Sequence, residues 1–352
     1  MNEHTTETIG CDLGDRYSHL CVLDISGQVT ERARVKTSQS GFRKWFAGRA
    51  SSTVIIEVGT HSRWVETQLQ KLGHEVIVAN AREVRLIYHG KRKNDRLDAE
   101  KLARLGRMDR KLLCPIQHRT EVTQTALTVL RCRDQLVETR TGMVNHVRGV
   151  SKSFGLRIKK GDICSFCRRA RQSLSEKNLL VVLEPILSCI EEVSKRIKQY
   201  EIEITKMANN SRAAQAILPI HGVGELTAMA FILTLENPSR FEKSRDVGAY
   251  LGLVPRERQT GNSDPELRIS KAGDGFVRKL LVNCAQYILG PFGRDSDLRR
   301  YGIRLMGRGG KNDKKKAVIA VARKLAVLMH RLWVTGEVYE PLRNQMEMTT
   351  GT

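Results

Sequence analysis

Short apolar runs separated by polar turns open the sequence, and they alternate with segments of helical periodicity. The predicted elements are, in chain order, strands 8–13, 18–24 and 28–36, helix 39–48, strand 53–57, helix 62–72, strand 75–80, and helices 81–88 and 94–107. Ser26 and Gly27 mark the turn between the second and third strands. Three strands in series, followed by alternating helices and strands, predict a mixed sheet flanked by helices.

Residues 119–210 contain almost no turn residues, and their pattern predicts long helices. Apolar side chains recur at alternating intervals of three and four residues, namely at Leu183, Ile186, Ile190, Val193, Ile197, Tyr200, Ile204 and Met207. A stripe this narrow favours a coiled-coil seam, within the chain or between chains, over an amphipathic helix on a globular core, whose stripe is broader. We therefore predict a coiled coil that supports self-association.

A third block, residues 216–335, is again predicted to be mostly helical. Within it, Gly222 and Gly224 form a turn between two apolar helices. A helix–hairpin–helix turn of this kind directs backbone N–H groups at a helix N-terminus towards a phosphate, whatever the base sequence. A tight turn between two core helices is the alternative. Together these patterns predict three domains, at residues 1–115, 116–212 and 213–352.

Composition indicates the class of partner. The chain has 352 residues, with 60 Lys and Arg against 38 Asp and Glu, and a formal net charge of +22. A surplus this large predicts a polyanionic partner, most simply a nucleic acid. A basic protein of membrane surfaces would need an amphipathic anchor, a lipidation signal or an apolar span of ~18 residues, and the sequence shows none. No signal peptide is recognised either, so we expect a soluble, cytoplasmic protein without a membrane partner.

The cysteines agree with that expectation. Most of the eight lie in apolar or helical patterns, where cysteine acts as a small hydrophobic residue. Cys164 and Cys167 form a single C-x-x-C, and a structural zinc site needs four ligands. We therefore predict reduced thiols and no zinc site.

Basic residues concentrate in two regions. The helical stretch at residues 131–160 is one of them, and residues 255–331, which hold 18 Lys and Arg against 7 Asp and Glu, are the other. The densest patch lies at residues 311–316. A solvated helix face is the ordinary explanation of a charge run, but an excess of one sign favours contact with backbone phosphates.

Four carboxylates carry the candidate chemistry. Asp12 and Glu57 end two short β-branched runs, while Asp95 and Asp98 lie three residues apart and so share one face of a predicted helix. Four converging carboxylates repel one another unless a cation neutralises them. Hard oxygen ligands suit Mg²⁺, and two-metal carboxylate sites serve phosphoryl transfer. Singly, each acid is typical of a solvated surface, so a metal site and an ordinary acidic surface both stay open.

Six motifs, in this order and spacing, give the sequence a family resemblance. They are Ile9–Asp12, Ile56–Thr60, Lys93–Ala99, Ile220–Gly224, Gly248–Pro255 and Ile269–Asp274. The chain resembles the DEDD transposases of bacterial and archaeal insertion sequences, a group whose members include bridge-RNA-guided recombinases. The resemblance extends over nearly the whole chain.

The resemblance implies a specific fold and reaction. It implies an α/β RNase H-like domain of the Holliday-junction-resolvase type, then a helical coiled-coil segment, then a mainly α transposase domain. In such enzymes the four acids bind Mg²⁺, and these carry over onto Asp12, Glu57, Asp95 and Asp98. A serine of the transposase domain attacks a DNA phosphate and forms a covalent protein–DNA ester, which a free DNA hydroxyl later reverses.

The serine of that motif does not carry over. After Gly252-Leu253-Val254-Pro255, the sequence has Thr260 before Gly261, where the family has serine. Threonine has a hydroxyl, but its γ-methyl crowds in-line attack and restricts its rotamers. Ser263 is the alternative nucleophile, and an impaired copy is a third interpretation. Another departure is His221, where the family has proline.

We therefore predict a prokaryotic, nucleoid-associated insertion-sequence transposase that uses Mg²⁺ and no energy cofactor. The resemblance also implies the element's DNA ends, a target DNA and a guide RNA as partners, and a dimer or tetramer. A hydrolytic junction resolvase and a catalytically impaired nucleic-acid-binding protein are the alternatives. The residues predicted to contact nucleic acid are Gly222, Gly224, Lys271, Lys314, Lys315 and Lys316.

Overall fold

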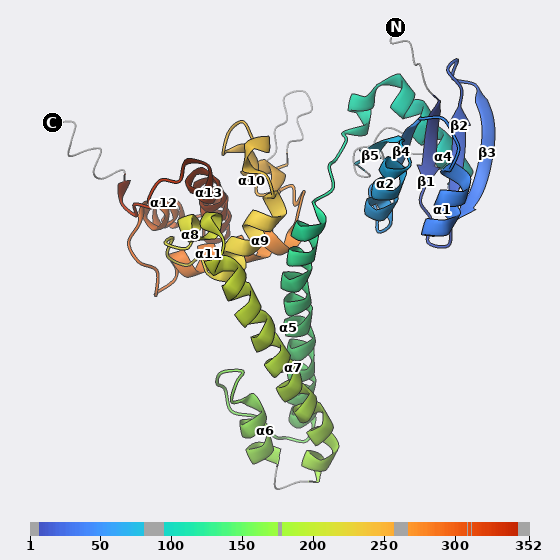
Figure 1. Ribbon diagram of the computed structural model, residues 1–352. Coiled ribbons are helices and arrows are strands. Elements are labelled where there is room, and N and C mark those ends of the chain that lie inside the picture. Colours follow the sequence, from blue (N-terminus) through green and yellow to red (C-terminus); the bar gives the residue numbers. More distant parts are fainter. Residues whose placement is uncertain are drawn as a thin grey trace, which may run out of the picture. The chain divides into compact units, whose positions relative to one another are not determined.

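The computed structural model describes residues 7–80, 95–174, 178–256, 267–307, 309–310 and 312–343, with Asp95 described by its backbone alone. The chain divides into two compact units, Met1–Arg119 and Thr120–Thr352 (Figure 1). The predicted helix 81–88 lies outside the described residues, and the division into three domains stays a prediction.

The first unit is built on a mixed five-stranded sheet with the strand order β3-β2-β1-β4-β5. Its strands are β1 (Thr8–Asp12), β2 (Tyr17–Leu23), β3 (Val29–Lys36), β4 (Thr53–Glu57) and β5 (Glu75–Ala79). Strands β1, β2 and β3 are antiparallel, whereas β4 runs parallel to both β1 and β5. All five predicted strands and the mixed character of the sheet are confirmed.

Helices cover both faces of this sheet. They are α1 (Gln39–Phe46), α2 (Ser62–Lys71) and α4 (Asp95–Met108), followed by the 3-10 helix η1 (Arg110–Leu113). Successive side chains of a strand point to opposite faces. Accordingly, Ile9 and Cys11 share a core with Phe42 and Val65 of α1 and α2, while the intervening Gly10 faces α4.

The contact between β1 and α4 is unusually close, because small residues meet there. A Cβ on Gly10 would lie 1.9 Å from the carbonyl oxygen of Ala99 and 2.6 Å from the amide nitrogen of Ala103. At the other end of the helix, Arg107 donates to the carbonyl oxygen of Asp24, just after β2, at 3.3 Å. Since β2 is antiparallel to β1, α4 also runs antiparallel to β1.

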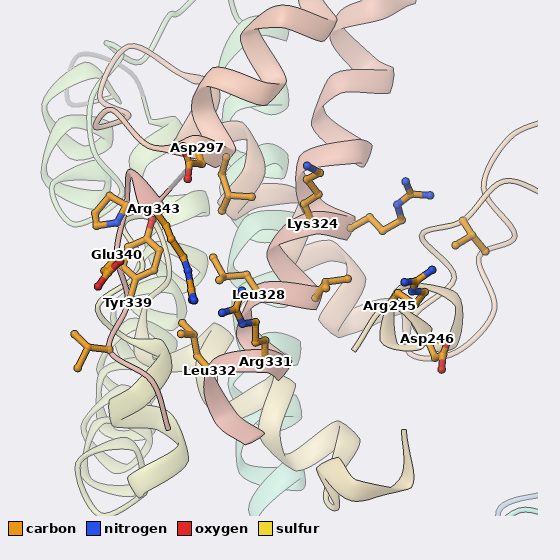
Figure 2. A pocket seen from close by; sticks show the side chains of 16 residues that line it. Arg245, Asp246, Asp297, Lys324, Leu328, Arg331, Leu332, Tyr339, Glu340 and Arg343 are labelled. Carbon is orange, nitrogen blue, oxygen red and sulfur yellow. The ribbon is translucent and has the colours of Figure 1, made fainter. Parts of the chain in front are cut away.

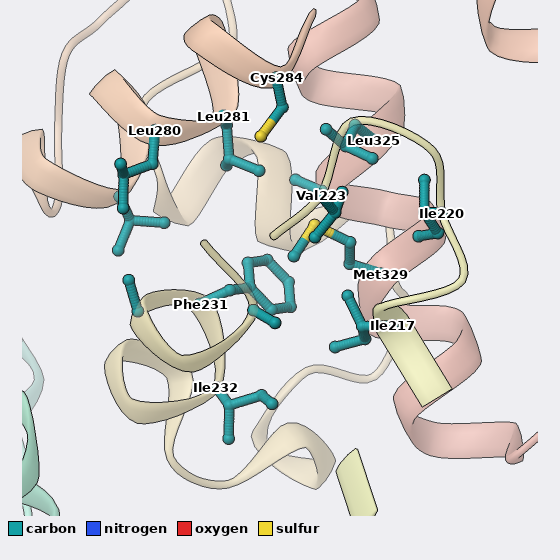
Figure 3. Packing of buried hydrophobic residues seen from close by; sticks show 14 of the residues in the cluster. Ile217, Ile220, Val223, Phe231, Ile232, Leu280, Leu281, Cys284, Leu325 and Met329 are labelled. Carbon is teal, nitrogen blue, oxygen red and sulfur yellow. The ribbon is translucent and has the colours of Figure 1, made fainter. Parts of the chain in front are cut away.

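The second unit is helical. It contains α5 (Glu121–Ser153), α6 (Phe166–Leu174), α7 (Leu179–Asn209), α8 (Arg212–Ile217), α9 (Glu225–Leu235), the 3-10 helix η2 (Pro238–Arg240), α10 (Asp246–Tyr250), α11 (Gly275–Leu289), α12 (Asp297–Met306) and α13 (Asp313–Thr335). Helix α9 is buried almost all round, and its Phe231 packs in one core with Leu281 of α11 and Met329 of α13 (Figure 3). Long helices were predicted throughout residues 119–210, but residues 154–165 interrupt them.

Helices α5 and α7 lie along each other (Figure 1). Arg133 donates to Glu201 at 2.5 Å and Arg140 to Ser194 at 3.4 Å, and this order of contacts makes the pair antiparallel. In the predicted seam of α7, four side chains are buried and four are half-buried, the buried ones being Leu183, Ile190, Ile197 and Ile204. The apolar stripe therefore has an intramolecular partner, and coiled-coil geometry and self-association stay predictions.

Membrane insertion through a helix finds no support in the described part of the chain, where every helix is too short or too polar to span a bilayer.

The close approach at Gly10 gives a first prediction. Gly10→Ala should lower the free energy of unfolding by about 1–3 kcal/mol, because the new methyl group meets backbone atoms that cannot rotate away. Gly59→Ala is the matched control, since a Cβ there meets nothing within 4 Å. Urea unfolding followed by tryptophan fluorescence reports mainly on this unit, which holds two of the three tryptophans. Equal midpoints for the two variants would contradict the packing described here.

Candidate active site and nucleic-acid interface

Two of the four predicted carboxylates lie on neighbouring strands. Strands β1 and β4 are parallel, with Cys11 opposite Ile56. The next residues, Asp12 and Glu57, therefore end the two strands side by side at the same edge of the sheet. Both are half-buried, in contrast to an ordinary solvated acid.

Helix α4 supplies the other two carboxylates. Its Ala99 contacts Gly10, two residues before Asp12. Going back from Ala99 to Asp95 along an antiparallel helix covers about 6 Å, and going forward from Gly10 to Asp12 covers about 7 Å. The first turn of α4 is thus carried to the edge where Asp12 and Glu57 end.

The structure describes some, but not all, of the carboxylate side chains expected at this edge. Asp98 is half-buried and accepts a hydrogen bond from Lys101 at 3.2 Å. The side chain of Asp95 lies outside the described residues. Among the side chains that are described, no three His, Cys, Asp or Glu residues are grouped closely enough to hold a metal ion. The backbone therefore brings the strand ends and the helix start together, and the complete ligand set stays a prediction.

His61 is a further polar residue of this region that the sequence analysis missed. It follows Glu57 by four residues and directly precedes α2. Trp64 Nε1 donates to His61 Nδ1 at 3.1 Å, so a neutral imidazole carries its proton on Nε2. That Nε2 lies 3.6 Å from the Asp15 carboxylate. The signal in the sequence was a histidine shortly after a strand-end acid, with a tryptophan one helical turn later.

Cys11 lies between Gly10 and Asp12, but its thiol is unreactive. Burial raises the pKa of its thiol, and the neighbouring Asp12 carboxylate raises that pKa further. The thiol is therefore protonated at neutral pH and is no thiolate ligand or nucleophile. All eight cysteines are free thiols, as predicted.

In the helical unit, two of the sequence motifs pack backbone against backbone. Gly252 has φ +67°, and a Cβ on it would lie 2.3 Å from the carbonyl oxygen of Ala272. Gly273 has φ +69°, and a Cβ there would lie 2.0 Å from the carbonyl oxygen of Tyr250. Only glycine fits at both positions, because any side chain would collide and the φ angles are unfavourable for other residues.

Hydrogen bonds connect the described residues on either side of positions 257–266, which include the predicted nucleophile. Arg256 N donates to Arg268 O at 3.1 Å, and Ser270 N donates to Val254 O at 2.9 Å. Arg278 donates through one nitrogen to Leu251 O at 2.8 Å and Ala272 O at 2.7 Å. Thr260 and Ser263 themselves lie outside the described residues.

The glycine turn before α9 is well defined. Gly222 has φ +91°, and a Cβ there would come within 3.2 Å of both Ile288 and Tyr287. Gly224 is the N-cap residue of α9, where no side chain caps the helix, and a Cβ on it would meet open space. The first turn of α9 therefore has space beside its start, and its phosphate-binding role stays a prediction.

The predicted lysine contacts are at the surface. Lys271 is exposed and has φ +55°. Lys314, Lys315 and Lys316 are exposed in the first turn of α13. Cations at a helix N-terminus oppose the helix dipole, so three successive lysines there do not serve helix stability. Their placement is consistent with an anionic partner.

A cavity of about 720 Å³ lies beside α13 in the same unit (Figure 2). Its lining includes Val254, five basic side chains and three acidic ones, namely Arg245, Arg323, Lys324, Arg331, Arg343, Asp246, Asp297 and Glu340. Arg331 and Arg343 each contact Glu337 at 2.7 Å. The hydrogen bond from Arg343, reinforced by Arg331, lowers the pKa of Glu337 below its ordinary value. The cavity thus has a mixed lining in which basic side chains outnumber acidic ones, and two of the arginines are paired with Glu337.

Comparison with known proteins matches both units. A family model of DEDD transposases of the IS110 type matches residues 9–154, and the model described as transposase of the IS116/IS110/IS902 family matches residues 214–297. The transposase for insertion sequence element IS1111A of Coxiella burnetii is 29% identical over 346 residues, covering 94% of this chain and 90% of the relative.

Two further relatives extend this comparison. The transposase for insertion sequence element IS1328 of Yersinia enterocolitica is 27% identical over 335 residues, covering 94% of this chain and 98% of the relative. The pilin gene-inverting protein of Moraxella bovis is 28% identical over 147 residues, covering 40% of this chain and 44% of the relative.

The role of Arg278 can be tested by removing its charge. Arg278→Met should destabilise the helical unit by about 1.5–3 kcal/mol, because two carbonyl oxygens lose a charged donor. Arg304→Met, at an exposed position of α12, is the control for the loss of one positive charge. The measurement is urea unfolding followed by far-ultraviolet circular dichroism. A variant as stable as the control would show that Arg278 does not hold the two motifs together.

Proposed function

We propose that this chain, which belongs to the IS116/IS110/IS902 family of transposases, cuts and rejoins DNA with Mg²⁺ through a covalent protein–DNA intermediate. Family membership itself makes the chain a DNA-recombining enzyme. The observation that supports the finer proposal is the acidic edge, the edge of the sheet at which Asp12 and Glu57 end neighbouring parallel strands and towards which the first turn of α4 extends.

The donor set at that edge fits a hard divalent cation. Asp12, Glu57 and Asp98 offer oxygen donors from half-buried positions, and Asp95 is the fourth member of the proposed set. Lys101 already neutralises part of the charge on Asp98. Magnesium bound there would stabilise the negative charge that develops on a phosphate during strand cleavage. An RNase H-like fold of this unit is part of the same proposal, and its mixed sheet is compatible with it.

The hydroxyl of Thr260 is the proposed nucleophile. A bond forms between its oxygen and the DNA phosphorus, and the bond from that phosphorus to one sugar oxygen breaks. The threonine proton leaves to a base or solvent, and the departing sugar oxygen takes up a proton. Attack by a DNA hydroxyl on the ester reverses this exchange and releases Thr260. Because one phosphodiester replaces another, no energy cofactor is required.

The partners follow from the same proposal. The element's DNA ends and a target DNA are the substrates, with a structured RNA as guide. Basic side chains of the helical unit, including Lys271 and Lys314, contact the backbones. The turn at Gly222 and Gly224 acts as a helix–hairpin–helix element, and the α5–α7 pair contributes to a dimer or tetramer through its outer surface.

A hydrolytic junction resolvase is the second candidate, and a nucleic-acid-binding protein with an impaired site is the third, which Thr260 in place of serine favours. In the resolvase reaction water attacks the phosphate and no covalent intermediate forms. A nucleic-acid-binding protein with an impaired site would bind DNA without cutting it. Trapping a DNA-linked protein on a denaturing gel distinguishes these three functions.

The acidic edge predicts a separation of cleavage from binding. Asp95→Asn or Asp98→Asn should reduce DNA strand cleavage on the order of 100-fold or more, since metal stabilisation of the transition state amounts to several kcal/mol. Nucleic-acid affinity should change little, because it depends on Lys and Arg elsewhere. Single-turnover cleavage and fluorescence anisotropy measure the two quantities.

Two control variants accompany the cleavage measurements on Asp95→Asn and Asp98→Asn. Lys101→Gln removes the partner of Asp98 and should leave cleavage largely intact. Glu7→Gln neutralises an exposed acid just before β1, at the opposite end of the strand from Asp12. Normal cleavage by Asp95→Asn, or an equal loss in Lys101→Gln, would refute the assignment of these carboxylates as metal ligands.

The nucleophile is tested by locating the adduct. Thr260→Ser should keep or raise adduct formation, because it retains the oxygen and removes the crowding methyl group. Thr260→Ala should abolish the adduct, and Ser263→Ala should only weaken it. Mass spectrometry of the nucleotide-bearing peptide reports the modified residue. An adduct on Ser263, or one undiminished in Thr260→Ala, would transfer the role to Ser263; cleaved DNA with no adduct in any variant would favour the resolvase.

A further inference from the structure

The end of the α5–α7 pair at which α6 lies is strongly basic (Figure 1). Residues 148–171 contain eight Lys and Arg and a single acid, Asp162. This short stretch therefore carries a net charge of +7 out of the chain's +22. We call the end of α5, the loop at residues 154–161 and α6 together the basic tip.

The basic tip has a hydrophobic core of its own. Val144 and Val147 of α5 pack with Phe166 and Ala170 of α6 and with Leu183 of α7. This cluster is separate from the core around α9, α11 and α13. The basic side chains are thus presented by a packed scaffold, which lowers the entropy lost on binding.

The loop backbone is also held in place. Gly155, with φ +77°, follows Phe154, the C-cap residue of α5, and its amide donates to Lys152 O at 2.9 Å. Arg169 of α6 then donates to Lys159 O at 3.2 Å and to Asp162 O at 2.7 Å. The guanidinium of Arg169 is therefore engaged in bracing the loop, and the other cations of the loop remain on its outer surface.

Asp162, the single acid in residues 148–171, does not neutralise the cations of the loop at residues 154–161. The Asp162 carboxylate accepts hydrogen bonds from Ser165 N and Ser165 Oγ, both at 2.8 Å, and these bonds lower the pKa of Asp162. Arg171 is likewise engaged, because it forms ion pairs with Glu184 at 2.7 Å and Glu191 at 2.6 Å. These contacts stabilise the scaffold and leave the charge of the loop uncompensated.

Four of the six remaining cations surround an open hollow of about 970 Å³. Arg148, Lys152, Arg157 and Lys160 line it, together with Gly155 and Gly161. Within the part of the chain that the structure describes, none of these four cations forms an ion pair. Arg148 is fixed over the ring of Phe166, with its guanidinium carbon 5.3 Å from the ring centroid. Like charges gathered around a concave surface repel one another unless an anion binds there.

We propose that this basic tip is a docking site for the phosphodiester backbone of a nucleic acid, with Lys152, Arg157 and Lys160 contacting phosphates. The ligand class rests on the proposed function, whereas the site shares no residue with the acidic edge or with residues 257–266. The backbone of a DNA duplex and that of a structured RNA share the required chemistry. The tip gives the chain a contact to nucleic acid beyond the residues that carry out the reaction.

The test uses the full chain with three charges removed, in the variant Lys152→Gln, Arg157→Gln, Lys160→Gln. Its matched control is Lys195→Gln, Lys198→Gln, Lys206→Gln, which removes three charges from exposed positions of α7 outside the tip. Fluorescence anisotropy measures the affinity of each protein for a labelled DNA duplex and, separately, for an RNA hairpin of the same length, over a range of salt concentrations.

Loss of three phosphate contacts should make the slope of log affinity against log salt shallower by about 2 to 3 for duplex DNA, and by a similar or smaller amount for RNA. A change with DNA alone assigns the site to DNA, and a change with RNA alone assigns it to RNA. The control variant should keep the slope of the wild type. A tip variant that matches the control with both nucleic acids would overturn the proposal.

Two further measurements separate docking from other effects. The charge-conserving variant Lys152→Arg, Arg157→Lys, Lys160→Arg should retain the wild-type slope, whereas a shallower slope in it would overturn a role based on charge. Hydrogen exchange of the wild type should show protection of amides in the loop when nucleic acid is added, and no protection would count against docking. Both readouts concern binding, so they hold even if no covalent adduct forms and the proposed function fails.

Discussion

The close contact between Gly10 of β1 and Ala99 and Ala103 of α4 is the constraint on which the candidate active site depends. Because Gly10 has no side chain, the helix backbone reaches the strand backbone directly. This contact sets the depth and direction of α4, and with them the position of Asp98 relative to the end of β1. The parallel pairing of β1 with β4 then places Glu57 beside Asp12. Two acids from distant parts of the sequence thereby end side by side at one edge, and the packing of α4 directs its first turn towards the same edge.

Close backbone contacts at glycine residues also occur in the helical unit. At Gly252 and Gly273 two motif segments meet backbone to backbone, and Arg278 joins their carbonyl oxygens. These contacts join the described segments on the two sides of residues 257–266. The proposed metal ligands lie on the α/β unit, whereas hollows with basic linings occur on both units, lined for example by Arg107 and Arg110 in the first and by Arg148 and Lys152 in the second.

Much of this architecture was predictable from local pattern. The five strands followed from short β-branched runs, and Asp12 and Glu57 were identified because each ends such a run. What the pattern could not supply was long-range contact. The stripe on α7 was evident, but nothing in its spacing showed that α5 would be its partner. The interruption after α5 was missed although Gly155 and Gly161 lie there, because the surrounding residues have helical character. His61 was missed because its hydrogen bond to Trp64 becomes evident only in three dimensions.

The most direct test of the central claim is divalent-cation binding at the acidic edge. Electron paramagnetic resonance of free Mn²⁺, titrated into the full chain with Mg²⁺ as competitor, measures occupancy without requiring DNA or catalysis. We expect the wild type to take up Mn²⁺, Mg²⁺ to displace it, and Asp12→Asn to lose most of this binding. Uptake by Asp12→Asn equal to that of the wild type, or no Mg²⁺-sensitive uptake by either protein, would contradict the account.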